Sequence, residues 1–352
     1  MNRLLQAAPL LLLAACGRKP DFAPVDSSFF AAAPKSKTPA AVSLGYTLKA
    51  GEIDAHTGAV TDLAFLDWAR FVTVSYDDQR VAVWTVADGA LISEAKHNRR
   101  LLAVAALPDG SGILTADAYG FLVFWPFGPS GLGASQTLNP ETGTSAVDTI
   151  ENRLGHHPRL AISPNGLLLA ASSYDQRVTI WDVRTRKELV RLATGRKMRA
   201  VAFSPDSRRI AVGGVDNTYT LWDLSTGVGR TVEIPKVSET SDVSGIAFSS
   251  DGTRLATGHM DSSLTLWDAD GGKERGNWFV QSSSVFDVAF SPDSALLAAS
   301  GYGGIVTLWD AKTAAAKGSL QGLEGSATCV AFSPDGAVLA AGGEKGRVLL
   351  FR

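Results

Sequence analysis

The stretch VAFSPDSRRIAVGGVDNTYTLWD, residues 201–223, contains the unit that decides the fold. Its first block, residues 201–206, reads as a strand that runs into a tight turn, where Pro presets φ and Asp favours the turn. Its last block, residues 219–222, alternates as a strand does and ends in Trp222. The first block recurs at residues 288–293 and 330–335, and the last at 81–84, 178–181, 264–267 and 306–309.

The Trp-ending strand marks a repeat along the chain. Its positions are Trp84, Trp125, Trp181, Trp222, Trp267 and Trp309, with Phe351 in the seventh. Five of the six spacings lie between 41 and 45 residues, and the sixth, from Trp125 to Trp181, is 56. A fixed period of this length is typical of repeat architectures built from small sheets.

The repeat resembles the WD40 family over residues 44–352. The Trp-Asp pair that names the family stands at Trp181-Asp182, Trp222-Asp223, Trp267-Asp268 and Trp309-Asp310. The resemblance implies an all-β fold, a seven-bladed β-propeller of four-stranded antiparallel blades. Because Arg352 follows the seventh Trp position directly, blade 7 lacks an outer strand of its own, and a bare edge invites intermolecular pairing. We expect Gly45–Lys49, which alternates like a strand, to complete that blade and close the ring.

The family's hydrogen-bonded tetrad of His, Ser or Thr, Asp and Trp is only partly recognisable. Blade 1 comes closest, with His56, Asp78 and Trp84, and no blade is expected to hold all four groups. We interpret the Asp residues as hydrogen-bond acceptors that fix turns rather than as catalytic acids. The remaining tetrad-like residues are Asp175, Trp181, Asp216, Trp222, Asp261, Trp267 and Trp309.

The N-terminus predicts a membrane anchor. Residues 1–15 combine Arg3 with an apolar run that is too short to span a bilayer, as in a signal peptide. The sequence Leu13-Ala14-Ala15-Cys16 resembles the lipobox of bacterial lipoproteins, which implies lipidation of Cys16; an ordinary signal peptide or a non-specific apolar start is the alternative. Gly17 in place of Asp favours the outer membrane, facing the periplasm. Residues 16–43, rich in Ala, Pro, Ser and Lys, are expected to form a flexible tether before the propeller at 44–352.

Composition excludes several classes of function. With 33 basic and 35 acidic residues, the chain has no electrostatic footprint of a nucleic-acid binder. The sequence carries no recognised catalytic or phosphate-binding motif, and we expect no cofactor and no metal, since His156-His157 has no acidic or cysteine company. Cys329 is expected to be a small buried hydrophobe. Trp68 and Trp278 fall outside the repeat, and the sequence does not decide whether they pack or lie exposed.

The loops at one end of the blades carry the functional hypothesis. Tyr and Arg are common interface anchors, which favours a non-catalytic scaffold, monomeric, binding protein partners in the cell envelope and no small-molecule substrate. Ordinary turn residues and a passive structural protein remain alternatives. So does a channel-site enzyme or small-ligand sensor like the propeller lactonases, although that would need acidic or histidine residues converging from several blades. The candidate rim residues are Tyr76, Asp77, Asp117, Tyr119, Tyr174, Met260, Phe286, Tyr302 and Arg199.

One blade carries an insertion. More residues separate Trp125 from Pro164 than separate the corresponding Trp and Pro in regular blades. The extra residues fall within 127–157. Insertions in repeat folds map to surface loops and often to a binding face. A tolerated loop is an equally valid interpretation.

Overall fold

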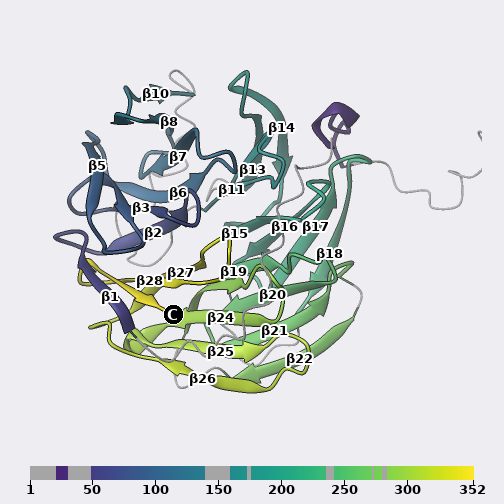
Figure 1. Cartoon of the computed structure of the whole chain (residues 1–352). Helices are drawn as coiled ribbons and strands as arrows, with labels where there is room; N and C mark the ends of the chain where they lie inside the picture. The colour runs from purple at the N-terminus through teal and green to yellow at the C-terminus, as the bar shows by residue number, and fades with distance from the viewer. Residues whose placement is uncertain are drawn as a thin grey trace, which may run out of the picture.

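The computed structural model describes residues 21–30, 49–138, 159–172, 176–234, 242–271, 273–279 and 284–352. These ranges hold β-strands and two short 3-10 helices, η1 (Ser27–Phe30) and η3 (Tyr302–Gly304). No helix among them is both long and apolar enough to cross a bilayer. Seven antiparallel sheets follow one another round a ring in chain order, which confirms the predicted all-β, seven-bladed propeller (Figure 1).

Each of the first three blades has its inner strand first and its outer strand last. Blade 1 contains β2 (Val60–Phe65), β3 (Arg70–Ser75), β4 (Arg80–Thr85) and β5 (Leu91–Lys96). Blade 2 contains β6 (Leu101–Ala106), β7 (Gly112–Asp117), β8 (Leu122–Gly128) and β10 (Gln136–Thr137), with β9 (Gly131–Leu132) paired to β8. Blade 3 contains β11 (Leu160–Ile162), β12 (Leu168–Ser172), β13 (Arg177–Asp182) and β14 (Lys187–Ala193).

The next three blades repeat the order, and the last one differs. Blade 4 contains β15 (Met198–Phe203), β16 (Arg209–Gly214), β17 (Thr218–Asp223) and β18 (Val228–Glu233). Blade 5 contains β19 (Val243–Phe248), β20 (Arg254–His259), β21 (Ser263–Asp268) and β22 (Glu274–Phe279). Blade 6 contains β23 (Val285–Phe290), β24 (Leu296–Gly301), β25 (Val306–Asp310) and β26 (Ala316–Leu320). Blade 7 contains β27 (Ala327–Phe332), β28 (Leu339–Gly343), β29 (Arg347–Phe351) and, as its outer strand, β1 (Lys49–Asp54).

The first strand of the chain closes the ring, as expected, but its bounds differ from the prediction. The described strand that pairs with β29 is Lys49–Asp54, so the pairing runs five residues beyond the predicted Gly45–Lys49; residues 45–48 lie outside the described part. Ile53 sets this register, because it is buried opposite Val348 while its neighbours Glu52 and Asp54 are exposed. The inner strand β27 also contacts β2, so blade 7 meets blade 1 directly.

The hydrophobic core lies between neighbouring blades rather than at the centre of the ring. One cluster joins Val72 and Val83 of blade 1 to Ile113 and Trp125 of blade 2, and similar clusters follow round the ring. Inner and middle strands are therefore buried on both faces, which explains their continuous apolar composition. Outer strands such as β5 and β14 alternate between half-buried and exposed positions.

The blades have two distinct ends. We call "turn end" the end at which the first strand turns into the second and the third into the fourth. We call "rim end" the opposite end, where the second strand turns into the third and each blade connects to the next. At the turn end of blades 3 to 7, one buried Ser hydroxyl donates a hydrogen bond to the Asn or Asp two positions later: Ser163, Ser204, Ser249, Ser291 and Ser333.

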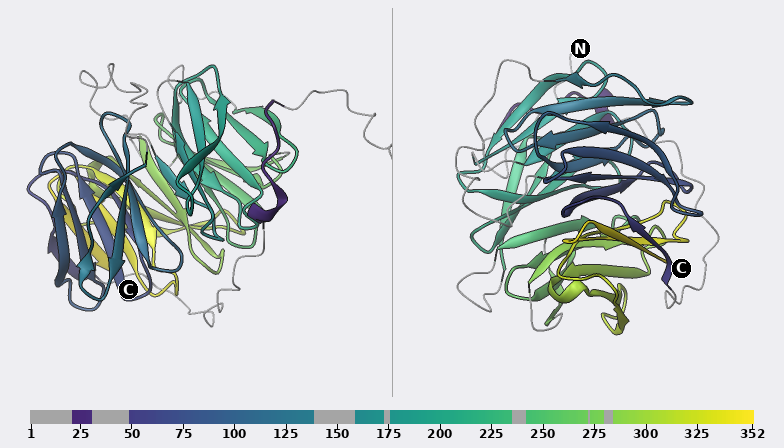
Figure 2. Two further views of the ribbon diagram at one scale, coloured as in Figure 1. Left: turned by 90° about the horizontal axis from the view of Figure 1, so that it is seen from above. Right: turned by 90° about the vertical axis from the view of Figure 1, so that its left-hand side faces the viewer.

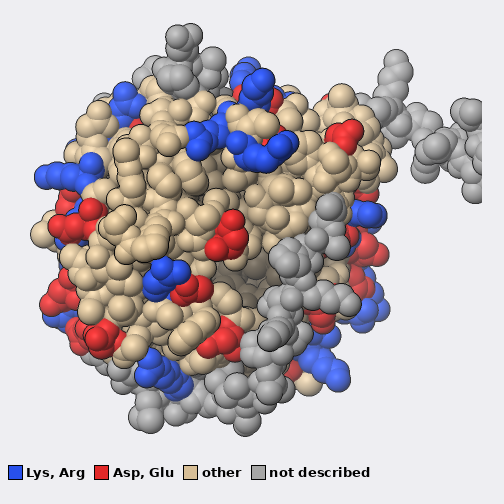
Figure 3. Space-filling view, turned by 45° about the horizontal axis from the view of Figure 1, so that its top comes forward, with Lys and Arg blue, Asp and Glu red and all other residues tan. Residues whose placement is uncertain are grey.

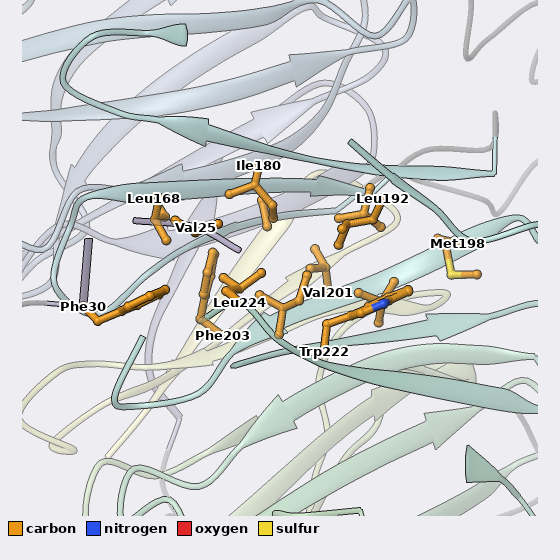
Figure 4. Close-up of a cluster of buried hydrophobic side chains, with 14 residues drawn as sticks. Val25, Phe30, Leu168, Ile180, Leu192, Met198, Val201, Phe203, Trp222 and Leu224 are labelled. Atoms are coloured by element: carbon orange, nitrogen blue, oxygen red, sulfur yellow. The ribbon is translucent and has the colours of Figure 1, made fainter. Parts of the chain in front are cut away.

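Residues 21–30, predicted to be part of a flexible tether, are docked on the propeller. We call them the latch segment; they lie at the turn end, against blades 3 and 4 (Figure 2). Val25 and Phe30 are buried in a cluster with side chains of both blades (Figure 4). The Val25 amide donates to the Leu224 carbonyl at 2.8 Å, and the Asn165 side-chain amide donates to the Phe29 carbonyl at 2.7 Å. Burial of apolar side chains explains why this part of the tether is not extended; its other residues lie outside the described ranges.

Candidate functional site: the rim end of the ring

Blade 1 holds a complete tetrad, which corrects the prediction that no blade would. His56 Nδ1 lies 2.9 Å from a carboxylate oxygen of Asp78, and His56 Nε2 lies 2.8 Å from Thr73 Oγ1. The indole N–H of Trp84 donates to the same Thr73 hydroxyl at 2.9 Å. Burial raises the pKa of Asp78, but hydrogen bonds from His56 and the backbone outweigh this effect, so the pKa lies below its usual value. The fourth member, Thr73, stands eleven residues before Trp84, a signal that the sequence interpretation missed.

The other blades retain parts of this arrangement. In blades 2 and 5 the Trp indole donates to a Thr of the second strand, from Trp125 to Thr115 at 3.0 Å and from Trp267 to Thr257 at 2.9 Å. Trp181 and Trp309 donate instead to a Thr two positions earlier on their own strand. Trp222 is buried in the cluster that holds the latch segment. These tryptophans are therefore structural.

The predicted Asp residues of the middle blades act as acceptors in turns. Asp216 accepts a hydrogen bond from the Thr218 hydroxyl at 2.8 Å and pairs with Arg196 at 2.6 Å. Asp261 accepts from the amide and the hydroxyl of Ser263. Asp175 lies outside the described residues. None of these contacts gives Asp216 or Asp261 a position suited to catalysis.

Two tyrosines are the exposed large hydrophobic side chains at the rim end of the described blades. Tyr119 of blade 2 is 49% exposed and Tyr302 of blade 6 is 52% exposed. The Tyr302 ring meets the Phe286 ring edge-on, with 4.8 Å between the centroids. Aromatic side chains with few rotatable bonds bind partners at a low cost in conformational entropy. The two tyrosines therefore present contact surface that is already held in place.

Arginines stack on the aromatic rings of blades 1 and 2. The Arg100 guanidinium lies over the Tyr76 ring at 4.5 Å and donates to the Tyr76 hydroxyl at 2.6 Å. The Arg99 guanidinium lies 3.9 Å from the Phe121 ring centroid and 5.6 Å from that of Tyr119. Cation–π contacts of this kind fix both partners.

Two of the predicted rim residues, Asp117 and Arg199, do not offer free side chains. Asp117 is fully buried and accepts hydrogen bonds from the Tyr119 and Phe121 amides, so it shapes the loop from within. Arg199 is buried and pairs with Asp242 of the next blade at 3.0 Å. Both are removed from the exposed surface. Met260 and Phe286 are half-buried, Asp77 is exposed and accepts from the Ala59 amide, and Tyr174 lies outside the described residues.

The insertion is only partly a loop. Phe127 and Gly128 belong to β8, which turns back into β9, and β10 pairs with β8 as the outer strand of blade 2. Residues 127–138 thus build the edge of a blade. The remaining inserted positions, 139–157, lie outside the described residues.

The central channel holds an ion cluster that the sequence interpretation missed. Arg159 of blade 3 reaches Asp62 of blade 1 at 3.1 Å and Asp287 of blade 6 at 3.6 Å. In six inner strands the pairing with the second strand of the blade shifts register near the start of the inner strand. The residue directly after the shift is Asp62, Ala103, Ala200, Gly245, Asp287 or Cys329. Two charged residues, Asp62 and Asp287, thus stand among small ones at the start of these six strands, and Arg159 directly precedes β11, the inner strand of the remaining blade. This contrast is the signal that could have revealed them.

The carboxylates of this cluster are fully engaged. Asp62 also accepts from the amides of Leu63 and Val104, and Asp287 from those of Val288 and Val330. Burial raises the pKa of Asp62 to about 6 against the opposing effect of Arg159, and burial likewise raises the pKa of Asp287. Burial also raises the pKa of the neighbouring Cys329 thiol, which is consistent with the predicted inert side chain. Figure 3 shows one face of the ring, hollowed near its middle, with acidic and basic side chains interspersed on it.

The described residues contain no cluster of three or more His, Cys, Asp or Glu side chains that could hold a metal ion. The channel group has one basic and two acidic members, all paired with each other or with backbone amides. This arrangement suits a brace across the ring better than a reactive centre.

Six segments of the chain match the WD40 family (WD domain, G-beta repeat), and together they cover more than half of it. The matched residues are 48–85, 151–182, 189–223, 233–268, 273–310 and 317–352. The protein therefore belongs to the WD40 family, whose propellers commonly bind protein partners and generally are not enzymes. Five of the six matched segments begin in or next to an outer strand and end with the third strand of the following blade, so consecutive repeats interlock. The segment 151–182 begins outside the described residues. A comparison with curated proteins found no match.

Proposed function

We propose that this protein is a lipid-anchored scaffold of the bacterial cell envelope that binds a protein partner through its rim end. The exposed pair Tyr119 and Tyr302 carries this proposal, because both rings are already held against Arg99 and Phe286. Interfaces draw most of their binding energy from a few Tyr, Trp and Arg side chains in fixed positions. A rigid ring avoids the cost of ordering the loops on binding.

The anchor in this proposal is a lipid on Cys16, and the location is the outer membrane, facing the periplasm. The motif Leu13-Ala14-Ala15-Cys16 supports the anchor, and Gly17 supports the location. More than one acyl chain gives stable attachment. The partner is then another envelope protein, and the propeller itself is monomeric.

A channel-site enzyme or small-ligand sensor is the second candidate. The convergence of Asp62 and Asp287 on the channel is the observation that favours it. However, Arg159 and four backbone amides already occupy these carboxylates, so a ligand would have to displace a buried ion pair. We therefore favour the scaffold.

Site-specific photo-crosslinking in native membranes tests the rim. A photoreactive amino acid at Tyr302 or Tyr119 is expected to give the same defined protein adduct from either position. The matched control is Leu189, an exposed apolar side chain of β14, which should not give this adduct. Combining Tyr119→Ala with Tyr302→Ala should abolish capture by a photoreactive residue at Asn98, an exposed neighbour at the rim end. Adducts that are identical at Leu189, or absent from both tyrosines, would contradict the proposal.

A further inference from the structure

The exposed large apolar side chains are unevenly distributed between the two ends of the blades. Among the described residues, those at the rim end are the two tyrosines named above. The other five lie at or near the turn end. One is in the turn between the first and second strands of blade 1, and four are at the start of an outer strand. They are Trp68, Leu91, Ile92, Leu189 and Val228.

Trp68 is the most exposed of these side chains, at 68%. It occupies the turn between β2 and β3, where blades 4, 6 and 7 carry the Ser-Pro-Asp sequence. The backbone of this turn is fixed by hydrogen bonds from the Leu66 amide to the Arg70 carbonyl and from the Ala69 amide to Asp67. A tryptophan held outward on a firm turn combines an apolar body with a polar N–H, which suits the interface between lipid and water.

The latch segment ties the N-terminal part of the chain to the same end. The Asp21 amide donates to the Gly227 carbonyl at 2.7 Å, and the Asp21 carboxylate accepts from the Gly229 amide at 2.8 Å. Both glycines belong to or flank the turn between β17 and β18. Asp21 is therefore fixed at the turn end of blade 4.

The chain before Asp21 is too short to reach the other end. Cys16 precedes Asp21 by five positions, which an extended chain spans in at most about 18 Å. A six-residue strand is about 20 Å long, so the connection cannot carry Cys16 past the rim end. Arg18 and Lys19 lie within it, and basic residues beside an anchor are attracted to anionic headgroups.

We infer that the turn end rests on the phospholipid surface, with Trp68 at headgroup depth, and that the latch segment sets this orientation. This inference rests on the proposed lipid anchor and extends it. The consequence for function is that the rim end faces away from the membrane, towards the partner. The anchor then orients the scaffold as well as retaining it.

Fluorescence quenching in vesicles tests the orientation. The lipidated full-length protein is reconstituted into vesicles of phosphatidylethanolamine and phosphatidylglycerol that carry a headgroup quencher. A dye is attached through Ala87→Cys at the turn end of blade 1 or through Asn98→Cys at its rim end, both exposed positions. Cys329 is buried, so it does not compete for the dye. We expect strong quenching at position 87 and little at position 98.

A second pair of variants separates the latch from the anchor. Val25→Asp places a charge in the buried cluster and should release the latch, so that the two dye positions become equally quenched while the protein stays on the vesicles. Ala23→Ser, at an exposed position of the same segment, should leave the difference intact. Equal quenching in the unaltered latch, or stronger quenching at position 98, would overturn the inference although the anchor stands. An intact mass without lipid on Cys16 would remove the anchor, and this orientation with it.

Discussion

The two ends of the propeller use polar residues in different ways. At the turn end the same local hydrogen bond returns from blade to blade, as between Ser249 and Asp251 and between Ser333 and Asp335, both 2.6 Å. At the rim end the side chains that join neighbouring blades differ from blade to blade, as Arg100 joins Tyr76 and Arg199 joins Asp242, and in the channel Arg159 joins Asp62 and Asp287. The repeated contacts shape single blades, whereas the unrepeated ones tie blades together and leave room for a specific surface.

The largest expected effect on stability comes from removing Arg159, which pairs with Asp62 and Asp287 across the channel. Arg159→Met leaves two buried carboxylates without their counter-charge, and removing one partner of a buried ion group typically costs about 3–5 kcal/mol. We expect this loss in the free energy of unfolding, measured with urea. Arg208→Met, at an exposed position of a turn-end loop, should change it by less than about 0.5 kcal/mol. Equal stability of the two variants would show that the channel cluster does not brace the ring.

The pH dependence of stability further distinguishes the channel cluster from the turn end. Asp62 has a pKa of about 6 in the folded protein against an ordinary value of 3.8, so the folded state holds a proton that the unfolded chain releases. This contribution to stability is complete below about pH 4 and is lost as the pH rises through about 6. The groups that face Asp62 are Arg159, which stays charged, together with Asp287 and Cys329, whose pKa values are also raised.

Asp62→Asn removes this proton-binding group. The free energy of unfolding of the wild type, relative to this variant, should therefore fall by about 1–3 kcal/mol between pH 4 and pH 7. Chemical denaturation at a series of pH values measures the difference. Parallel curves for the two proteins would mean that Asp62 titrates in its ordinary range.

The smallest effects are expected at the turn end, and they should add. Ser249→Ala and Ser333→Ala each remove a hydroxyl that donates to an Asp and accepts from a backbone amide, at a cost of about 1 kcal/mol. Because another blade separates the two turns, the double variant should lose the sum to within about 0.5 kcal/mol. Arg159→Met combined with Asp62→Asn should deviate from additivity, since these residues are in contact. Coupling between the two serines would contradict the view that each turn acts within its own blade.

The difference between repeated and unrepeated contacts also explains what the sequence could predict. The seven blades, their order and the closing strand were predictable because they rest on a period, which strand alternation and turn chemistry repeat many times. The alternation of Gly45–Lys49 predicted a strand only as far as Lys49, whereas the pairing with β29 continues to Asp54. Only the burial of Ile53 against blade 7 selects Lys49–Asp54.

The features that were missed occur once. Asp62, Arg159 and Asp287 are single departures in three blades, far apart in the chain, and only ring geometry brings them together. The latch segment has no periodicity, although Phe22, Val25, Phe29 and Phe30 are bulky apolar residues in a linker otherwise rich in Ala, Pro, Ser and Lys. The sequence correctly placed Asp117 and Arg199 at the rim end of the blades, but the burial of their side chains depends on partners in the folded ring.

The donated strand also dictates an order of events during folding. β1 is made first but pairs with β29, the last strand, so Asp54 finds Arg347 only when nearly the whole polypeptide is present. Contacts between such distant positions form late, because the intervening chain must first be organised. A nascent chain therefore carries an unpaired β1 until β29 has been made. Loss of Arg347–Phe351 would leave the first strand without a partner for the lifetime of the molecule.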